Sequence, residues 1–109
     1  MWVQFDHGVS NLNPEALEAL EVWVNALGDV EGPGSGRWRV TGHTDTSGSP
    51  ATNEALSLER AEVVVTWLQA RLNLGPTLVE LEWLGSKQPC CESDGLNRRV
   101  EVIWVPSLQ

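Results

Sequence analysis

The sequence predicts one α/β domain over residues 1–109, an α+β two-layer sandwich with two main helices packed on one face of a four-stranded mixed sheet. Three observations predict it. Short alternating segments and two long stretches of helical period follow one another in the order β-α-β-α-β-β. No internal repeat divides the chain. With 109 residues, 41% of them hydrophobic, it can form a single core without metals or disulfides.

The first strand is predicted at residues 3–5, where apolar and polar side chains alternate. The first helix follows a turn-rich segment. Asn13 suits the N-cap, Pro14 suits the first helical position, and Gly28 suits the C-terminal cap. Between them lies one apolar stripe, made of Leu17, Leu20, Val24 and Leu27.

A glycine-rich stretch at 28–36 has neither helical nor strand period, and we expect it to be a connector. A second strand is predicted at 38–41. The long helix is predicted over Asn53–Leu74, because its apolar residues recur at helical spacing and Gly75-Pro76 ends the pattern. Those apolar residues are Ala61, Val64, Val65, Leu68 and Leu72.

The last two strands are predicted at Leu78–Leu84 and Val100–Val105, separated by a loop at 85–97. The first of them alternates strictly, as expected of a strand with one buried face. Its apolar face carries Val79, Leu81 and Trp83, and its polar face carries Glu80 and Glu82.

Charge excludes one class of partner. The chain has 15 acidic and 7 basic residues, for a net charge of −8, so we expect no nucleic-acid binding. Its apolar runs are too short for a membrane span or a secretory signal. Cys90 and Cys91 are adjacent, so they can bond only to each other and cannot join distant segments.

A polar loop at 42–50 follows the second strand and leads into the long helix, which is where open α/β sheets bind ligands. It contains Asp45. Asn53, Ser57 and Arg60 then lie on one face of the helix. A carboxylate and a guanidinium at one site suit a zwitterion, with its ammonium on the aspartate and its carboxylate on the arginine. The spacing also leaves a plainer alternative, in which Asp45 bonds its own backbone, Asn53 caps the helix and Arg60 is solvated.

Four motifs add to this: GHTDxxG at 42–48, Asn53, LSxxRA at 56–61 and NRRVE at 97–101. Together they closely resemble the peptidoglycan-binding domain at the C terminus of OmpA-type proteins, which is also found in MotB-type and Pal-type proteins. The resemblance covers about residues 2–105. It implies a non-enzymatic module of the periplasm or cell envelope, without cofactor or metal. Such a module holds the wall non-covalently by the diaminopimelate residue of the stem peptide.

The resemblance also implies roles for five residues. Asp45 corresponds to the aspartate that binds the diaminopimelate ammonium, and Arg60 to the arginine that binds its carboxylate. Asn53 and Arg98 correspond to residues that line the pocket. Thr44 is expected to contribute beside Asp45.

Domains of this kind usually hang from an outer-membrane barrel, a lipid anchor or an inner-membrane helix. None of these is recognisable in the 109 residues. We therefore expect the chain to be the C-terminal domain of a longer envelope protein, with any membrane attachment made by a segment outside it.

Two departures from the family pattern support an alternative function. The loop before Asn97 is shorter than in relatives, and Gly8 stands where many relatives have a polar residue. In this alternative the fold is an interaction or structural module with weak or lost wall binding. It would pair with itself as a homodimer, or with an envelope partner, through residues such as Trp2 or Trp67.

Other chemistry has little support. His7, His43, Asp45 and the two cysteines are metal-ligand types, but they lack the spacing of a known metal motif. No nucleophile is paired with a base, and the alternation of Glu80 and Glu82 with apolar residues predicts a solvated strand face. We expect no enzymatic activity.

Overall fold

The computed structural model describes residues 1–28, 36–72, 79–91 and 94–105. Its elements follow the predicted order, with one short helix added. They are β1 (Trp2–Gln4), α1 (Pro14–Gly28), β2 (Arg37–Gly42), α2 (Pro50–Leu72), β3 (Val79–Trp83), α3 (Asp94–Asn97) and β4 (Arg99–Val105).

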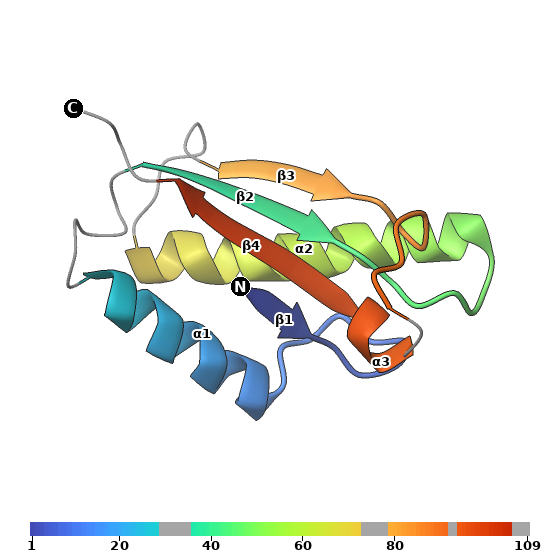
Figure 1. Ribbon diagram of the computed structural model, residues 1–109, viewed down its shortest axis with the longest axis horizontal. Coiled ribbons are helices and arrows are strands. Elements are labelled where there is room, and N and C mark those ends of the chain that lie inside the picture. The colour runs from blue at the N-terminus through green and yellow to red at the C-terminus, as the bar shows by residue number, and fades with distance from the viewer. Residues whose placement is uncertain (29–35, 73–78, 92–93, 106–109) are drawn as a thin grey trace.

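The four strands form one sheet in the order β1-β4-β2-β3 (Figure 1). β4 runs antiparallel to both of its neighbours, whereas β2 and β3 are parallel. A parallel pair needs a long crossover, and α2 lies in the connection between β2 and β3. The predicted mixed sheet is confirmed.

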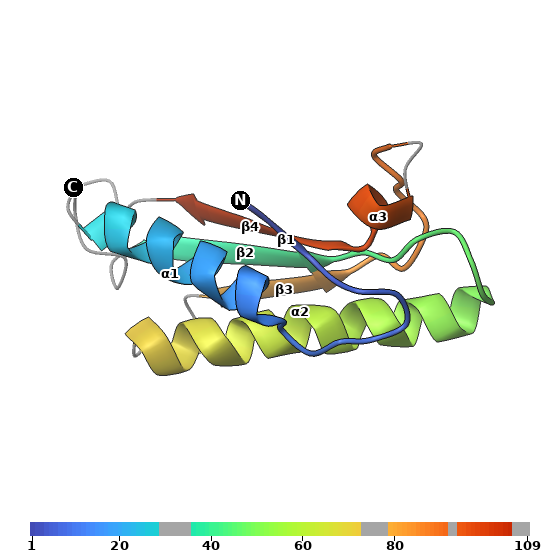
Figure 2. The same ribbon diagram turned by 90° about the horizontal axis from the view of Figure 1, so that it is seen from below.

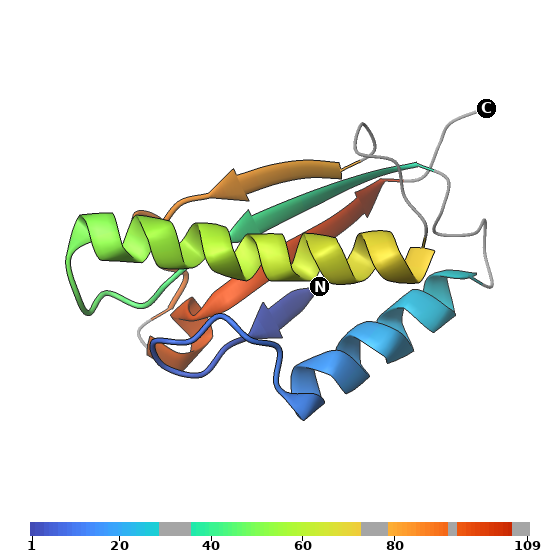
Figure 3. The same ribbon diagram turned by 180° about the vertical axis from the view of Figure 1, so that it is seen from behind.

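The helices form the second layer. Seen from below, α2 runs beneath the sheet along its length, and α1 lies toward the β1 edge (Figure 2). From behind, α2 crosses in front of the strands (Figure 3). In α1, Trp23 packs edge-to-face on Trp38 of β2, with 5.5 Å between ring centroids. The residues that fill the space between the layers include Val3, Leu20, Val24, Trp38, Val40, Ala61, Val64, Leu68, Val100 and Val102.

Three side chains differ from the predicted pattern. Leu17 is exposed, and Ala16 takes its place in the buried stripe because positions 16, 20 and 24 fall on the sheet-facing side of α1. Trp83 is 40% exposed because β3 is an edge strand. Trp67, suggested above as a surface contact, instead packs against the core, while Trp2 is exposed.

The element boundaries shift by a few residues. α2 begins at Pro50 rather than Asn53, because Ser49 is the cap and its Oγ accepts from Thr52 N at 3.2 Å. α3 lies within the segment predicted as a loop. Residues 29–35 of the connector predicted at 28–36 lie outside the described residues, as does the helix stop predicted at Gly75-Pro76.

Candidate functional site

The C-terminal ends of β2 and β3 are pressed against the first half of α2. At Gly42 any side chain would overlap the backbone of Ser57, so the end of β2 touches the helix. Ser57 Oγ accepts from Gly85 N at 2.9 Å, and Gly85 O accepts from Thr44 N at 2.9 Å. These contacts fix the start of the polar loop at the sheet edge where the site was predicted.

Asp45 lies at the centre of this site, and the whole residue is only 6% exposed. Its Oδ1 accepts from Ser47 N at 3.1 Å and from Ser47 Oγ at 2.6 Å. Its Oδ2 lies 3.3 Å from His7 Nδ1 and 3.5 Å from Arg98 Nη1. The local turn expected of a loop aspartate is therefore present, and one carboxylate oxygen faces two basic side chains.

These partners set the protonation of Asp45. Burial is the largest single influence and raises the pKa, but the bonds from Ser47, His7 and Arg98 together outweigh it. The pKa of Asp45 is therefore lowered from its ordinary value of 3.8. The side chain is an anion at neutral pH.

Arg60 is fully buried, so the solvated alternative is wrong. Its guanidinium donates from Nε to Val9 O at 2.9 Å, from Nη1 to His43 O at 3.2 Å and from Nη2 to Asp6 O at 3.0 Å. It also lies 5.3 Å from the centre of the Phe5 ring. Arg60 thus ties the segment after β1 to the segment after β2.

Asp45 and Arg60 interact through charge. Burial lowers the pKa of Arg60 to about 10, against the opposing effect of Asp45, so the guanidinium stays charged at neutral pH. Within the described residues no hydrogen bond joins the two side chains. The three carbonyl bonds use three of the five N–H groups of a guanidinium, which leaves one on Nη1 and one on Nη2.

Arg98 is the more accessible arginine, with 23% of its side chain exposed. Its Nε donates to Phe5 O at 3.0 Å, and its Nη1 reaches Asp45. Arg99 points away from this site, because its Nε donates to Glu101 Oε2 at 2.9 Å and its guanidinium lies over the ring of Trp2. Only one of the paired arginines reaches the site, as adjacent residues at the start of a strand should behave.

Thr44 and Asn53 are both buried, and among the described residues neither side chain has a hydrogen bond to the Asp45 carboxylate. Thr44 Oγ1 donates to Asp45 O at 3.0 Å. Asn53 Nδ2 donates to Ser86 Oγ at 3.4 Å, across to the segment after β3. Both side chains hold the loops that shape the site, and Asn53 is not the helix cap.

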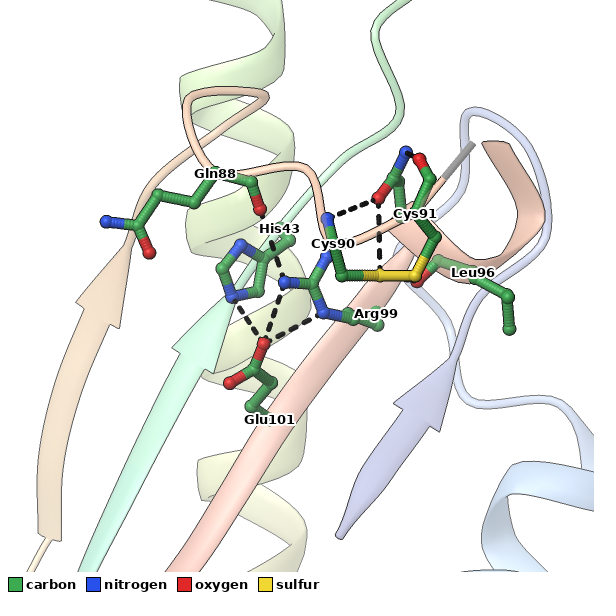
Figure 4. Close-up of a disulfide and its surroundings, with 8 residues drawn as sticks. His43, Gln88, Cys90, Cys91, Leu96, Arg99 and Glu101 are labelled. Carbon is green, nitrogen blue, oxygen red and sulfur yellow. Dashed lines mark hydrogen bonds and ion pairs between the residues drawn. A yellow bond between two sulfur atoms is a disulfide. The ribbon is translucent and has the colours of Figure 1, made fainter. Parts of the chain in front are cut away.

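A second polar cluster, made of His43, Arg99, Glu101 and the backbone of Gln88, is drawn in Figure 4. His43 is 2% exposed, and its Nε2 lies 3.3 Å from Glu101 Oε2 without hydrogen-bond geometry. Arg99 Nη2 lies 2.7 Å from the same oxygen and donates to Gln88 O at 3.3 Å. Burial, reinforced by the positive charge of Arg99, lowers the pKa of His43 despite Glu101. The imidazole is therefore neutral.

Cys90 and Cys91 form a disulfide with each other, as their adjacency allowed (Figure 4). Asn97 holds this pair, because its Oδ1 accepts from Cys90 N and its Nδ2 donates to Cys91 O, both at 2.9 Å. Since Asn97 immediately precedes Arg98, the disulfide segment is fixed beside an arginine of the site.

The sequence pointed to His7 only as one of several metal-ligand types, yet it stands at the mouth of the site with 73% of its side chain exposed. No local signal could pair it with Asp45, because 38 residues separate them. The other metal-ligand types lie elsewhere, with His43 beside Glu101 and the cysteines in their disulfide. Among the described residues, no cluster of three such side chains is positioned to hold a metal ion.

A sequence model of the OmpA family matches residues 4–102. The chain belongs to the OmpA family. The peptidoglycan-associated lipoprotein of Pseudomonas aeruginosa is 35% identical to this OmpA-family chain over an alignment of 103 residues that covers 90% of the chain and 58% of the lipoprotein. Outer membrane protein A of Shimwellia blattae is 38% identical over 69 residues, which are 63% of the chain and 28% of that protein. The chain thus spans little more than half of the lipoprotein.

Solved structures agree on the fold. The peptidoglycan-associated lipoprotein of Burkholderia pseudomallei aligns with a TM-score of 0.73 at 22% identity, covering 95% of this chain and 89% of that one. The cell wall anchor of the T6SS from Pseudomonas aeruginosa aligns with a TM-score of 0.75 at 25% identity, covering 95% and 76%. Across the described part of the OmpA-family chain, no helix combines the length and the apolar character that crossing a membrane requires.

Proposed function

We propose that this OmpA-family domain binds bacterial peptidoglycan non-covalently and anchors an envelope protein to the wall from the periplasm. The names of its relatives support the polymer, since one is peptidoglycan-associated and another is a cell wall anchor. The observation that carries the proposal is the placement of one ionised carboxylate, Asp45, close to two arginines, Arg60 and Arg98. We infer that the domain recognises and does not catalyse.

The proposed ligand group is the diaminopimelate residue of the stem peptide. Its side chain ends in an ammonium and a carboxylate on one carbon. Asp45 would accept the ammonium, while Arg98 and the remaining N–H groups of Arg60 would donate to the carboxylate. Thr44 and Asn53 would contribute by keeping the loops in place. Lysine, which lacks that carboxylate, should bind more weakly.

The direct test is a calorimetric titration of the domain with free diaminopimelate, with a stem peptide containing it, and with the lysine equivalent. We expect saturable binding of the two diaminopimelate ligands. Asp45→Asn should weaken it roughly tenfold to a hundredfold, because a charge-assisted hydrogen bond contributes about 1.5–3 kcal/mol.

Glu80→Gln is the matched control, because it also removes one negative charge but lies on β3, paired with Arg39. It should leave binding unchanged. Arg60 is a poor first target, since its loss would also remove three hydrogen bonds that join two segments. A folded domain that binds neither diaminopimelate ligand would contradict the proposal and favour the interaction-module alternative.

A further inference from the structure

A groove of about 360 Å³ adjoins the Asp45 site. It runs along β1, between the first half of α1 and the short helix α3, and Figure 1 shows β1 flanked by these two helices. Two alanines and a glycine in its lining, Ala16, Ala19 and Gly95, leave the space open. Its lining includes Trp2, Gln4, Ala16, Ala19, Gly95 and Arg98.

One wall of the groove is an unpaired strand edge. β1 is the last strand of the sheet and pairs only with β4. Met1 exchanges both backbone hydrogen bonds with Val102, at 2.8 and 2.7 Å, and Phe5 N donates to Arg98 O at 2.8 Å. In an antiparallel ladder the intervening residues point their N–H and C=O groups the other way. The backbone groups of Trp2 and Gln4 therefore face outward, and no other described residue bonds to them.

The groove and the proposed wall-binding site meet at Arg98. Arg98 belongs to both, because it lines the groove and its Nη1 lies 3.5 Å from Asp45 Oδ2. A ligand group held at Asp45 would therefore lie next to Arg98, which lines the groove along β1. The rest of the ligand, which is covalently attached to that group, would then either lie in the groove or extend into solvent.

The outward groups of β1 match an extended peptide. Trp2 and Gln4 are two residues apart, so their outward groups repeat at about 6.8 Å, the repeat of an extended α-linked chain. In a peptidoglycan stem this spacing suits the α-linked part that begins at diaminopimelate, because a γ-linked glutamate before it lengthens the repeat. Peptides that add to a strand edge gain affinity from such main-chain bonds. The volume suits a few residues of peptide and is too small for a folded partner.

We propose that the outer edge of β1 binds the peptide backbone of the peptidoglycan stem, next to the diaminopimelate residue held at Asp45. The inference rests on the proposed function, since it takes its ligand from there. The stem peptide has amide N–H and C=O groups, which can form hydrogen bonds with the unpaired C=O and N–H groups of β1. The domain would then recognise both the side-chain end and the backbone of its ligand.

The test compares free diaminopimelate with the stem tetrapeptide L-Ala-γ-D-Glu-diaminopimelate-D-Ala by calorimetry. In the unmodified domain the tetrapeptide should bind about tenfold more tightly. Ala19→Trp should fill the groove and remove that advantage, leaving the affinity for free diaminopimelate unchanged. Ala26→Trp is the control, because Ala26 is exposed on α1 two helical turns further on and does not line the groove.

The outcomes separate the two proposals. If free diaminopimelate binds but the tetrapeptide has no advantage, or keeps it in Ala19→Trp, the groove inference is overturned and the proposed function stands. The groove inference is also overturned, and the proposed function stands, if tighter binding than that of free diaminopimelate appears only when the glycan disaccharide is attached to the tetrapeptide. If neither ligand binds the folded domain, both proposals fail.

Discussion

The two arginines of the candidate site, Arg60 and Arg98, differ in burial and therefore in how their charge is stabilised. A buried guanidinium loses its hydration, so it needs hydrogen bonds to remain charged. Arg60 makes them by donating to three backbone carbonyl groups, and these bonds also fix the segment after β1. Arg98 keeps part of its side chain in solvent. Arg60 therefore holds the candidate site together, and Arg98 is the arginine that the proposed ligand would reach from solvent.

His43 makes a prediction about pH. Because its pKa is lowered from the ordinary value of 6.5, the folded domain resists protonating a side chain that the unfolded chain protonates freely. Stability is therefore fully present above that value and falls as pH is lowered through the interval down to the folded pKa. The slope for one proton is at most about 1.4 kcal/mol per pH unit. Denaturant unfolding between about pH 8 and about pH 5 measures it.

The chain offers its own control, since His7 is its other histidine and is largely exposed. His7→Gln should keep the loss of stability on acidification, and His43→Gln should reduce it. An NMR titration of the unmodified domain checks the cause directly, because the His43 ring should stay neutral at pH values where an ordinary imidazole is half protonated. A His43 ring that titrates near 6.5 would refute the prediction.

For single residues, the sequence predicted which side chains share one face of a helix, but it did not predict contacts between segments far apart in the chain. Asn53, Ser57 and Arg60 share the buried face that their spacing indicated, because helix geometry alone determines it. The three carbonyl partners of Arg60 lie in segments whose approach depends on the whole fold. The contact of His7 with Asp45 likewise depends on how the whole fold brings two distant segments together.

The contact between β2 and α2 makes a prediction at the scale of elements. A methyl group at Gly42 would overlap the Ser57 carbonyl, which belongs to the helix backbone and cannot rotate aside. Gly42→Ala should therefore push α2 away from the sheet and lower the free energy of unfolding by about 3 kcal/mol, the upper range for overpacking. Chemical denaturation measures the loss.

Gly8→Ala is the comparison, because its methyl would meet no atom within 4 Å. Its cost should come only from the left-handed backbone, with φ of +70°, and amount to about 1 kcal/mol. Equal losses in the two variants would show that the helix contact does not set the cost at Gly42.

Element boundaries were predictable where the signal was local. Asn13 caps α1, since its Oδ1 accepts from Ala16 N at 2.8 Å, and α1 begins at Pro14 and ends at Gly28 as predicted. For α2 the apolar period starts later than the helix, so the pattern missed the turn that Ser49 caps. The four-residue α3 is too short to show any period.

At the scale of the whole molecule, the sheet has two different faces. One is covered by α1 and α2 and carries the core. The other carries charged pairs, such as Arg39 Nε at 3.4 Å from Glu80 and 3.6 Å from Glu82. The alternation in β3 predicted this polar face, whereas the groove beside β1 depends on how α1 and α3 end up flanking an edge strand.

The net charge of −8 leads to a last prediction, on salt. An anionic domain gains nothing from long-range attraction to an anionic wall, so the proposed binding would depend on short contacts at the largely buried Asp45. Raising the ionic strength from about 0.01 M to about 0.15 M shortens the Debye length from about 30 Å to about 8 Å. That change screens the general repulsion but leaves contacts within hydrogen-bond distance almost unaffected.

Co-sedimentation with purified cell-wall sacculi should therefore stay constant or increase over this range of salt. Asp45→Asn gives the background at each salt concentration, and Glu80→Gln should follow the unmodified domain because its charge lies on β3. Binding that falls steeply with salt would indicate attraction between opposite surface charges, which the composition does not provide, and would place the contact away from Asp45.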